Sequence, residues 1–246
     1  MTTQGIADDD SEALPLLAVG TTADIYLVDE ETVLRRYRDV HDATAEAALM
    51  RHVAEHGFPV AEVYSAQGRD LVMERLHGPT LLVALAAGEF NLHDGADIMA
   101  DLHRRLHAIP APRRAGDESA AGDDVVVHLN IHPGNIVLSE SHGPALVDWA
   151  NARTGSLDLD TAMSAIILGE VAVDSEGDYS RAARAMLVAF LAVADGNPLA
   201  QLDVAAQSRL NDPALFAGEK SLVVPAAALV RQYSRDVIIG GEPTAS

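Results

Sequence analysis

Apolar residues change their spacing near residue 77, from short runs broken by turns to stripes with helical spacing. Before that point, the runs are separated by glycine or acidic turns, which is typical of strands joined by tight connections. Residues 42–56 interrupt them, because apolar residues recur there every third or fourth position until Gly57. This segment predicts one helix. The strands predicted from the runs cover residues 14–19, 25–28, 32–37, 60–66 and 71–73.

Helical spacing dominates the rest of the chain. Residues 94–109 place Ile98, Leu102 and Leu106 on one face, which predicts a helix. Residues 136–138 and 145–147 predict a hairpin, and the charged segment 111–124 predicts a loop. Further helices are expected from residue 158 onward, with breaks near 174–177, 196–198 and 211–213.

A β-rich part followed by an α-rich part predicts an α+β fold with two lobes. Residues 1–13 are polar and acidic, and we expect a disordered tail there. Residues 14–76 are then a small β-rich N-lobe, and residues 77–246 a larger α-helical C-lobe. The pattern makes no prediction about the oligomeric state.

Composition and charge exclude several classes of protein. The formal net charge of −20 argues against nucleic-acid binding, which depends on Lys and Arg neutralising phosphates. Without cysteine, the chain has no disulfides and no thiolate metal site. No leader and no apolar run of membrane-spanning length is visible, so a cytoplasmic protein without membrane contact is expected. The acids suit a cationic small molecule, although a solvated surface explains them more simply.

Four polar residues have the spacing of a phosphoryl-transfer loop and its metal acid. In the form H-x-D-x-x-x-x-N, the Asp accepts the proton of the substrate hydroxyl and the Asn helps to bind magnesium. His128 and Asn135 fit the ends of this frame, and Asp148 follows an apolar strand as the second metal acid. Asn130 stands where the base belongs, and an amide takes up no proton at neutral pH. The motif therefore predicts metal binding, but it leaves open whether the protein catalyses phosphate transfer.

In order and spacing these parts resemble the aminoglycoside phosphotransferase and choline kinase family, whose fold is similar to that of the protein kinases. The resemblance spans about residues 16–162 and is most specific over 128–162, where HPGN, DW and G-x-x-x-x-D follow one another. It implies a two-lobe protein-kinase-like fold, ATP and Mg2+ as cofactors, and a hydroxyl of a small molecule as the phosphate acceptor. Asn135 and Asp148 would hold the metal, while the alternative is that both are turn residues.

The resemblance also implies a set of nucleotide-binding residues. Gly20 lies in the turn that covers the triphosphate in this family, although a lone glycine is more often a plain turn. Arg35 occupies the position of the lysine that binds the α- and β-phosphates, and Glu46 is expected to form an ion pair with it. Residues 71–76 resemble the hinge that binds adenine through its main chain. The hinge residues expected to contact the nucleotide are Met73, Glu74 and Leu76.

Several neighbouring residues are expected to act as scaffold. His128 and His132 would brace the loop, and Asp160 matches an acid that steadies the same loop. The alternative for His132 is a role as substitute base. His103 and His107 lie one helical turn apart, a spacing that a metal site could use, but a core helix explains them better.

Asn130 leaves three interpretations open. It is an engineered substitution, or it is natural in a kinase that is slow or uses another catalytic base, or the chain is a pseudokinase. We favour a phosphotransferase with weakened catalysis, because the metal residues are intact; the alternative is an inactive nucleotide-binding regulatory module. Candidate acceptors are aminoglycosides, choline-like amines, amino alcohols, sugars and other antibiotics. Acids expected to recognise an amine are Asp174, Glu176 and Asp178.

Overall fold

The structure is a computed structural model of the 246-residue chain, and it describes residues 14–39, 42–112, 124–174 and 177–240. The predicted tail, most of the predicted loop 111–124, and Glu176 lie outside the described residues. The chain forms two compact units, one of residues 1–78 with 137–150 and one of residues 79–136 with 151–246.

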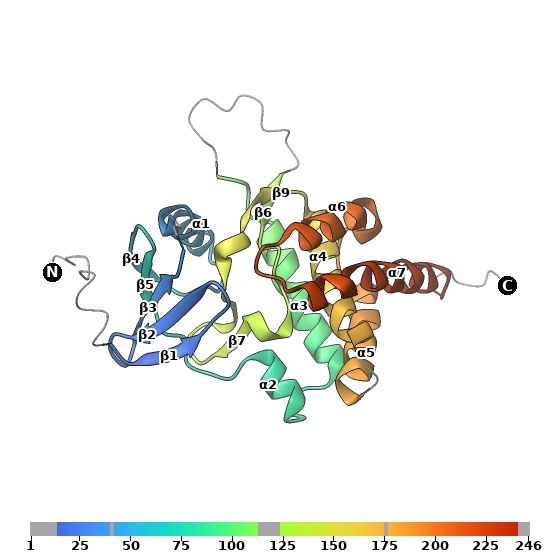
Figure 1. The fold of residues 1–246 in the computed structure, drawn as a ribbon, viewed down its shortest axis with the longest axis horizontal. Helices are drawn as coiled ribbons and strands as arrows, with labels where there is room; N and C mark the ends of the chain where they lie inside the picture. Colours follow the sequence, from blue (N-terminus) through green and yellow to red (C-terminus); the bar gives the residue numbers. More distant parts are fainter. Residues whose placement is uncertain (1–13, 40–41, 113–123, 175–176, 241–246) are drawn as a thin grey trace. The chain divides into compact units, whose positions relative to one another are not determined.

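In its described part, the first unit is built on a five-stranded antiparallel sheet in the order β1-β2-β3-β5-β4. The strands are β1 (Leu16–Val19), β2 (Ala23–Leu27), β3 (Thr32–Tyr37), β4 (Val63–Gln67) and β5 (Asp70–Glu74). Helix α1 (Ala43–Glu55) packs against β4 and β5 (Figure 1). It begins at Asp42, whose side chain accepts the Thr44 N–H at 3.0 Å and caps the helix.

A hairpin of β7 (Ile136–Ser139) and β8 (Gly143–Leu146) follows much later in the chain, and residues 137–150 belong to the first unit. Leu146 forms a parallel bridge with Val60, and its N–H donates to the Pro59 carbonyl at 3.2 Å. The Trp149 ring packs edge-on against Phe58, with centroids 5.8 Å apart. Packing to residues 58–60 therefore holds this distant segment in the unit.

The second unit consists mainly of helices gathered around α4 (Leu157–Asp174) (Figure 1). Because α4 is buried on most of its circumference, apolar residues occur on all its sides and the sequence shows little amphipathic pattern. The other helices are α2 (Leu81–Ala86), α3 (Leu92–His107), α5 (Asp178–Val193), α6 (Pro198–Asn211) and α7 (Ala217–Gly240). Strands β6 (Val125–Val127) and β9 (Arg153–Gly155) pair antiparallel.

The expected α+β class, with a β-rich part followed by helices, is confirmed. The predicted strands, the hairpin, the helices at 42–56 and 94–109, and the three breaks after residue 158 all have counterparts in the structure. Helix α2 and the β6–β9 pair were not predicted, since both are short. The first unit includes residues 137–150, which lie within the predicted C-lobe, and the predicted limits of the functional lobes stay a prediction. No helix in the described ranges is long and apolar enough to cross a membrane.

Candidate functional site

Arg35 is the centre of a buried charge cluster in the first unit. It lies on β3 and its Nη1 donates to Glu46 Oε1 on α1 at 3.2 Å, while its Nη2 donates to Asp148 Oδ1. Arg35 and Glu46 are both buried, at 7% and 6% exposure. The predicted Arg35–Glu46 ion pair is confirmed. Arg36, the next residue, forms a bidentate pair with Asp70 on β5, as alternation along the strand requires.

Tyr37 completes this cluster, and it was not identified from the sequence. It lies two residues after Arg35 and therefore on the same face of β3. Its hydroxyl donates to Glu46 Oε2, and its ring centroid lies 4.8 Å from the Arg35 guanidinium carbon. Burial raises the pKa of Tyr37 far above its ordinary range, and the charge of Glu46 adds to this effect. The spacing of two residues from Arg35 was the sequence signal that could have identified Tyr37.

The two carboxylates of the cluster keep the Arg35 guanidinium protonated. Burial by itself lowers the pKa of Arg35, but the charges of Asp148 and Glu46 outweigh burial and raise it. One guanidinium thus faces two carboxylates, and the three side chains carry a net charge of −1 when Glu46 and Asp148 are ionised. A divalent cation near Asp148 is consistent with this excess of negative charge.

Asp148 lies two residues after the end of β8, close to the strand end at which the sequence predicted an acid. Its φ is +66°, a left-handed backbone conformation that residues other than glycine rarely adopt. Such a conformation costs free energy and is retained where the surrounding structure requires it, often at functional sites. With 37% of its side chain exposed, the Asp148 carboxylate is accessible as well as paired.

The loop that carries Asn130 is held in the second unit by Asp160 on α4. The Leu129 N–H donates to Asp160 Oδ1 at 2.6 Å, and the His128 N–H donates to Oδ2 at 3.1 Å. Leu129 has a φ of +62°, so Asp160 stabilises a second strained residue, directly before Asn130. Burial by itself raises the pKa of Asp160, but the hydrogen bond from His107 and the nearby histidines outweigh burial and lower it to about 2. The predicted steadying role of Asp160 is confirmed.

Within the loop, Asn135 is oriented by the main chain of Asn130. The Asn135 Nδ2 donates to the Asn130 carbonyl at 3.0 Å, so the amide oxygen is the atom that Asn135 can offer to a metal. His132 Nδ1 accepts the Gly134 N–H at 3.1 Å and shapes the short 3-10 helix η2 (Pro133–Asn135). His132 therefore acts as scaffold, as expected.

His103 and His107 are core residues of α3. In His103, Nδ1 donates to the Met99 carbonyl at 2.8 Å, so Nε2 accepts the Ser164 hydroxyl at 3.0 Å in the neutral ring. Burial lowers the pKa of His103, which favours this neutral form. His107 Nε2 donates to Asp160 Oδ2 at 2.9 Å. The expectation that a core helix explains both histidines is confirmed.

Gly20 forms a tight turn between β1 and β2. Its N–H donates to the Ala23 carbonyl at 3.0 Å, and a Cβ at position 20 would lie only 2.7 Å from that oxygen. Glycine is therefore required by the turn itself. Its predicted contact with the triphosphate stays a prediction.

The predicted adenine hinge comprises the end of β5 and the residues that follow it. The Glu74 N–H donates to the Glu62 carbonyl and the Arg75 N–H to the Glu31 carbonyl, each at 2.8 Å. Among the described residues, the Leu76 N–H has no hydrogen-bond acceptor. Met73 is half-buried in β5, opposite Val33. Leu76 thus has a main-chain donor available to a base; adenine binding stays a prediction.

The two predicted metal residues belong to different units, Asn135 to the second and Asp148 to the first. Each carries the hard oxygen that magnesium prefers. Among the described residues, no group of three or more His, Cys, Asp or Glu side chains has the arrangement of a metal site. Their joint magnesium site stays a prediction.

The acids expected to recognise an acceptor amine lie around the break between α4 and α5. Asp174 is the last residue of α4, and Asp178 opens α5, where it pairs with Arg181 on the next turn. Their role also stays a prediction.

Comparison with known proteins agrees with this geometry. A family model described as the phosphotransferase enzyme family matches residues 14–122, which include Gly20, Arg35, Glu46 and the hinge. No curated protein matches the chain significantly.

Several solved structures share the fold. A thermostable mutant of aminoglycoside phosphotransferase APH(4)-Ia, in a ternary complex with AMP-PNP and hygromycin B, aligns with a TM-score of 0.53 at 15% identity over 94% of each chain. The gentamicin complex of APH(2")-IIa aligns with a TM-score of 0.51 at 13% identity over 96% of each chain. Amicoumacin kinase hAmiN, in complex with AMP-PNP, Ca2+ and Ami, aligns with a TM-score of 0.52 at 13% identity, over 94% of this chain and 89% of that chain.

At these identities the structural likeness establishes the fold. The resemblance found in the sequence is confirmed: residues 14–122 match the phosphotransferase enzyme family, and the chain has the kinase-like fold of the aminoglycoside phosphotransferases.

Proposed function

We propose that the protein is an ATP- and Mg2+-dependent phosphotransferase that moves the γ-phosphate to a hydroxyl of a small molecule. One observation carries the proposal: the Arg35 guanidinium holds Glu46 and Asp148 at the same time. These are the strand cation, the helix acid and the metal acid expected from the family resemblance. Their assembly in one cluster supports the proposal that this site binds phosphate.

Arg35 retains donors for a nucleotide while it holds both acids. A guanidinium has five N–H donors, and the two bonds to Glu46 and Asp148 use one each. We expect the other three to include the donors that bind the α- and β-phosphates, for which a planar fork is well suited. In the hinge, the Leu76 N–H would donate to the base, with Met73 and Glu74 beside it.

For the metal, we propose Asn135 and Asp148 as ligands. One amide oxygen and one carboxylate are sufficient, because Mg2+ keeps several waters and takes further oxygens from the phosphates. When bound, the ion neutralises charge on the transferring phosphate. Arg35 shares the Asp148 carboxylate and so orients it.

Asn130 would face the acceptor hydroxyl. In the transfer, the hydroxyl oxygen bonds to the γ-phosphorus while the bond from that phosphorus to ADP breaks, and the hydroxyl proton must leave. Asn130 can accept a hydrogen bond from the hydroxyl, but it cannot keep the proton, which then passes to a phosphate oxygen or to water. Since general-base catalysis contributes about 10²–10⁴-fold, we expect slow turnover.

The acceptor that we propose is a small molecule carrying an amine, such as an aminoglycoside or an amino alcohol. The net charge of −20 favours a cation, and Asp174 and Asp178 are candidate contacts. Solved structures with this fold have hygromycin B or gentamicin in their complexes.

Asn130 also favours a second candidate, a nucleotide-binding regulatory module without turnover. Thermal denaturation with and without ATP and Mg2+ tests what both candidates share. Ligand at 100 times its Kd stabilises the folded state by about 2.7 kcal/mol, so a rise in Tm of several degrees is expected. Arg35→Met is the matched control and should show a smaller rise. If ATP with Mg2+ leaves the Tm of the wild type unchanged, both candidates are rejected.

A further inference from the structure

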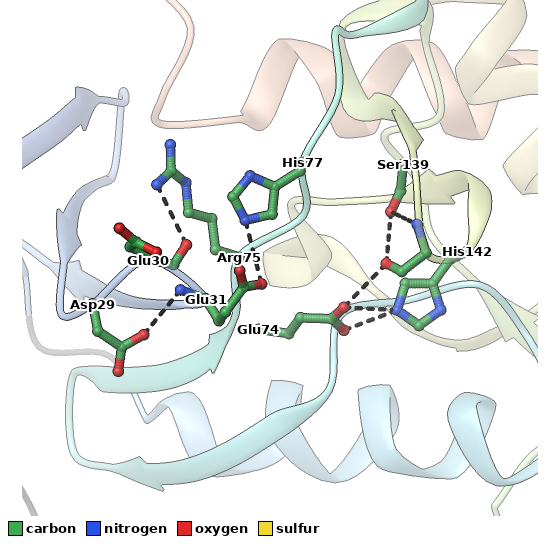
Figure 2. Close-up of polar contacts among 9 residues, drawn as sticks. Asp29, Glu30, Glu31, Glu74, Arg75, His77, Ser139 and His142 are labelled. Atoms are coloured by element: carbon green, nitrogen blue, oxygen red, sulfur yellow. Dashed lines mark hydrogen bonds and ion pairs between the residues drawn. The ribbon is translucent and has the colours of Figure 1, made fainter.

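The Glu74 side chain ties the predicted hinge to the tip of the β7–β8 hairpin. Its two carboxylate oxygens lie 3.0 and 2.9 Å from His142 Nε2, and Ser141 Oγ donates to Oε1 at 3.2 Å (Figure 2). The Glu62 N–H donates to Oε2 at 3.1 Å. The Glu74 carboxylate therefore accepts hydrogen bonds from Glu62, the residue before β4, and from the hairpin tip more than sixty residues later in the chain.

Two main-chain features bring the same segments together. The Glu140 N–H donates to the His77 carbonyl at 3.0 Å. Gly78 has a φ of +141°, and a Cβ there would lie 2.0 Å from the Leu138 carbonyl oxygen. The two residues that follow the hinge are thus in direct main-chain contact with the hairpin, which only glycine at position 78 permits.

The turn before β3 holds the hinge from its other flank. The Arg75 N–H donates to the Glu31 carbonyl at 2.8 Å. Arg75 Nη1 also donates to the Glu30 carbonyl at 3.4 Å (Figure 2). His77 Nε2 lies 3.4 Å from Glu31 Oε2. Leu76 lies between these anchored residues, and its N–H has no acceptor within the described chain.

The surroundings of Glu74 favour the ionised form of its carboxylate. Burial by itself raises the pKa of Glu74, but the Glu62 N–H and the contact with His142 outweigh burial and lower it. The side chain of Glu74 is 18% exposed and that of His142 is 32% exposed. A partly buried carboxylate with several donors is a rigid attachment point.

We propose that His142 is a positioning residue for the nucleotide base. By binding both oxygens of Glu74, it fixes the course of the hinge main chain and hence the direction of the Leu76 N–H. The inference rests on the proposed function, because it requires that the hinge binds adenine. His142 touches no nucleotide in this account and acts through Glu74.

Calorimetric titration of His142→Ala and His142→Gln with three ligands tests the proposal: Mg2+-ATP, adenosine, and Mg2+-tripolyphosphate, which lacks a base. His142→Ala should weaken ATP and adenosine binding by about 5- to 10-fold, the loss expected for one charge-assisted hydrogen bond. Tripolyphosphate binding should change less than about twofold, because it does not use the hinge. His142→Gln keeps a donor near the position of Nε2 and should restore most of the affinity.

His93→Ala is the matched control, since His93 is exposed on α3 and its ring makes no hydrogen bond among the described residues. Unchanged ATP and adenosine binding in His142→Ala would overturn the inference and leave the proposed function standing. Equal losses for all three ligands would overturn it too, because they indicate a general structural effect. Failure of the wild type to bind Mg2+-ATP would instead reject the proposed function itself.

A double-mutant cycle with Glu74→Gln provides an independent measurement. If His142 acts through Glu74, the losses in adenosine affinity from the two single variants should be far from additive. Additive losses would contradict the proposed route.

Discussion

Arg35 Nη2 donates directly to the carboxylate of Asp148, a residue 113 positions later in the sequence. The same guanidinium binds Glu46, so one cation links the sheet, helix α1 and the end of the β7–β8 hairpin. Loss of this cation would leave two carboxylates facing each other.

Arg35→Ala should lower the free energy of unfolding at pH 7 by about 3 kcal/mol, because it leaves the buried Glu46 without its cation. The side chains of the pair are only 8% and 3% exposed, so water compensates little. Urea denaturation measures the loss. Arg38→Ala is the control, since Arg38 is 44% exposed and pairs with Asp24 at the surface, where ion pairs contribute little. Equal losses in both variants would show that burial of the Arg35–Glu46 pair has no special effect.

Asn130→Asp should raise kcat by about 10²–10⁴-fold, because it supplies the missing base. Binding of ATP should change little, since position 130 faces the acceptor in this proposal. Phosphate transfer from ATP to a panel of amino sugars and amino alcohols measures the gain and identifies the acceptor. If both the wild type and Asn130→Asp bind ATP but transfer phosphate to no member of the panel, the regulatory module would be favoured over the enzyme.

Asp160 should make stability depend on pH in the acid range. Its folded pKa of about 2 lies below the ordinary 3.8, so the unfolded chain takes up the proton first as the pH falls. The contribution is complete above about pH 4 and is lost towards pH 2, and it amounts to about 2 kcal/mol. Asp160→Asn should therefore be less stable than the wild type at pH 7, and the difference should narrow towards pH 2.

Chemical denaturation at several pH values measures this narrowing. Asp97→Asn removes one exposed carboxylate from α3 and controls for the change in net charge. A difference between wild type and Asp160→Asn that stays constant from pH 7 to pH 2 would contradict the assignment.

Gly78→Ala should destabilise the protein by at least about 2 kcal/mol, because the new Cβ would clash with the Leu138 carbonyl and the backbone is left-handed. Gly88→Ala is matched for positive φ but meets no atom within 4 Å, so it should cost about 1 kcal/mol. Thermal and urea denaturation compare the two. A smaller effect at position 78 than at position 88 would show that hinge and hairpin are not closely apposed.

The sequence by itself determined most of the secondary structure and the order of the parts. Helix α1 and the four helices after residue 157 follow from apolar spacing and from Gly, Pro and Asn at their ends, which act through local backbone geometry. Arg35 and Glu46 could be paired because both are close in sequence and match a family pattern. Asn130, Asn135 and Asp148 were found in the same way, by spacing in one string.

Only the tertiary structure decided which distant side chains meet. The contacts of Arg35 with Asp148, of Glu74 with His142 and of Asp160 with the Leu129 N–H span 113, 68 and 31 residues. Tyr37 had a visible spacing from Arg35, but its bond to Glu46 depends on how α1 packs on the sheet. Periodicity reports which face of an element is buried, whereas the partner of a polar group depends on strand register and chain packing, which a single sequence does not encode locally.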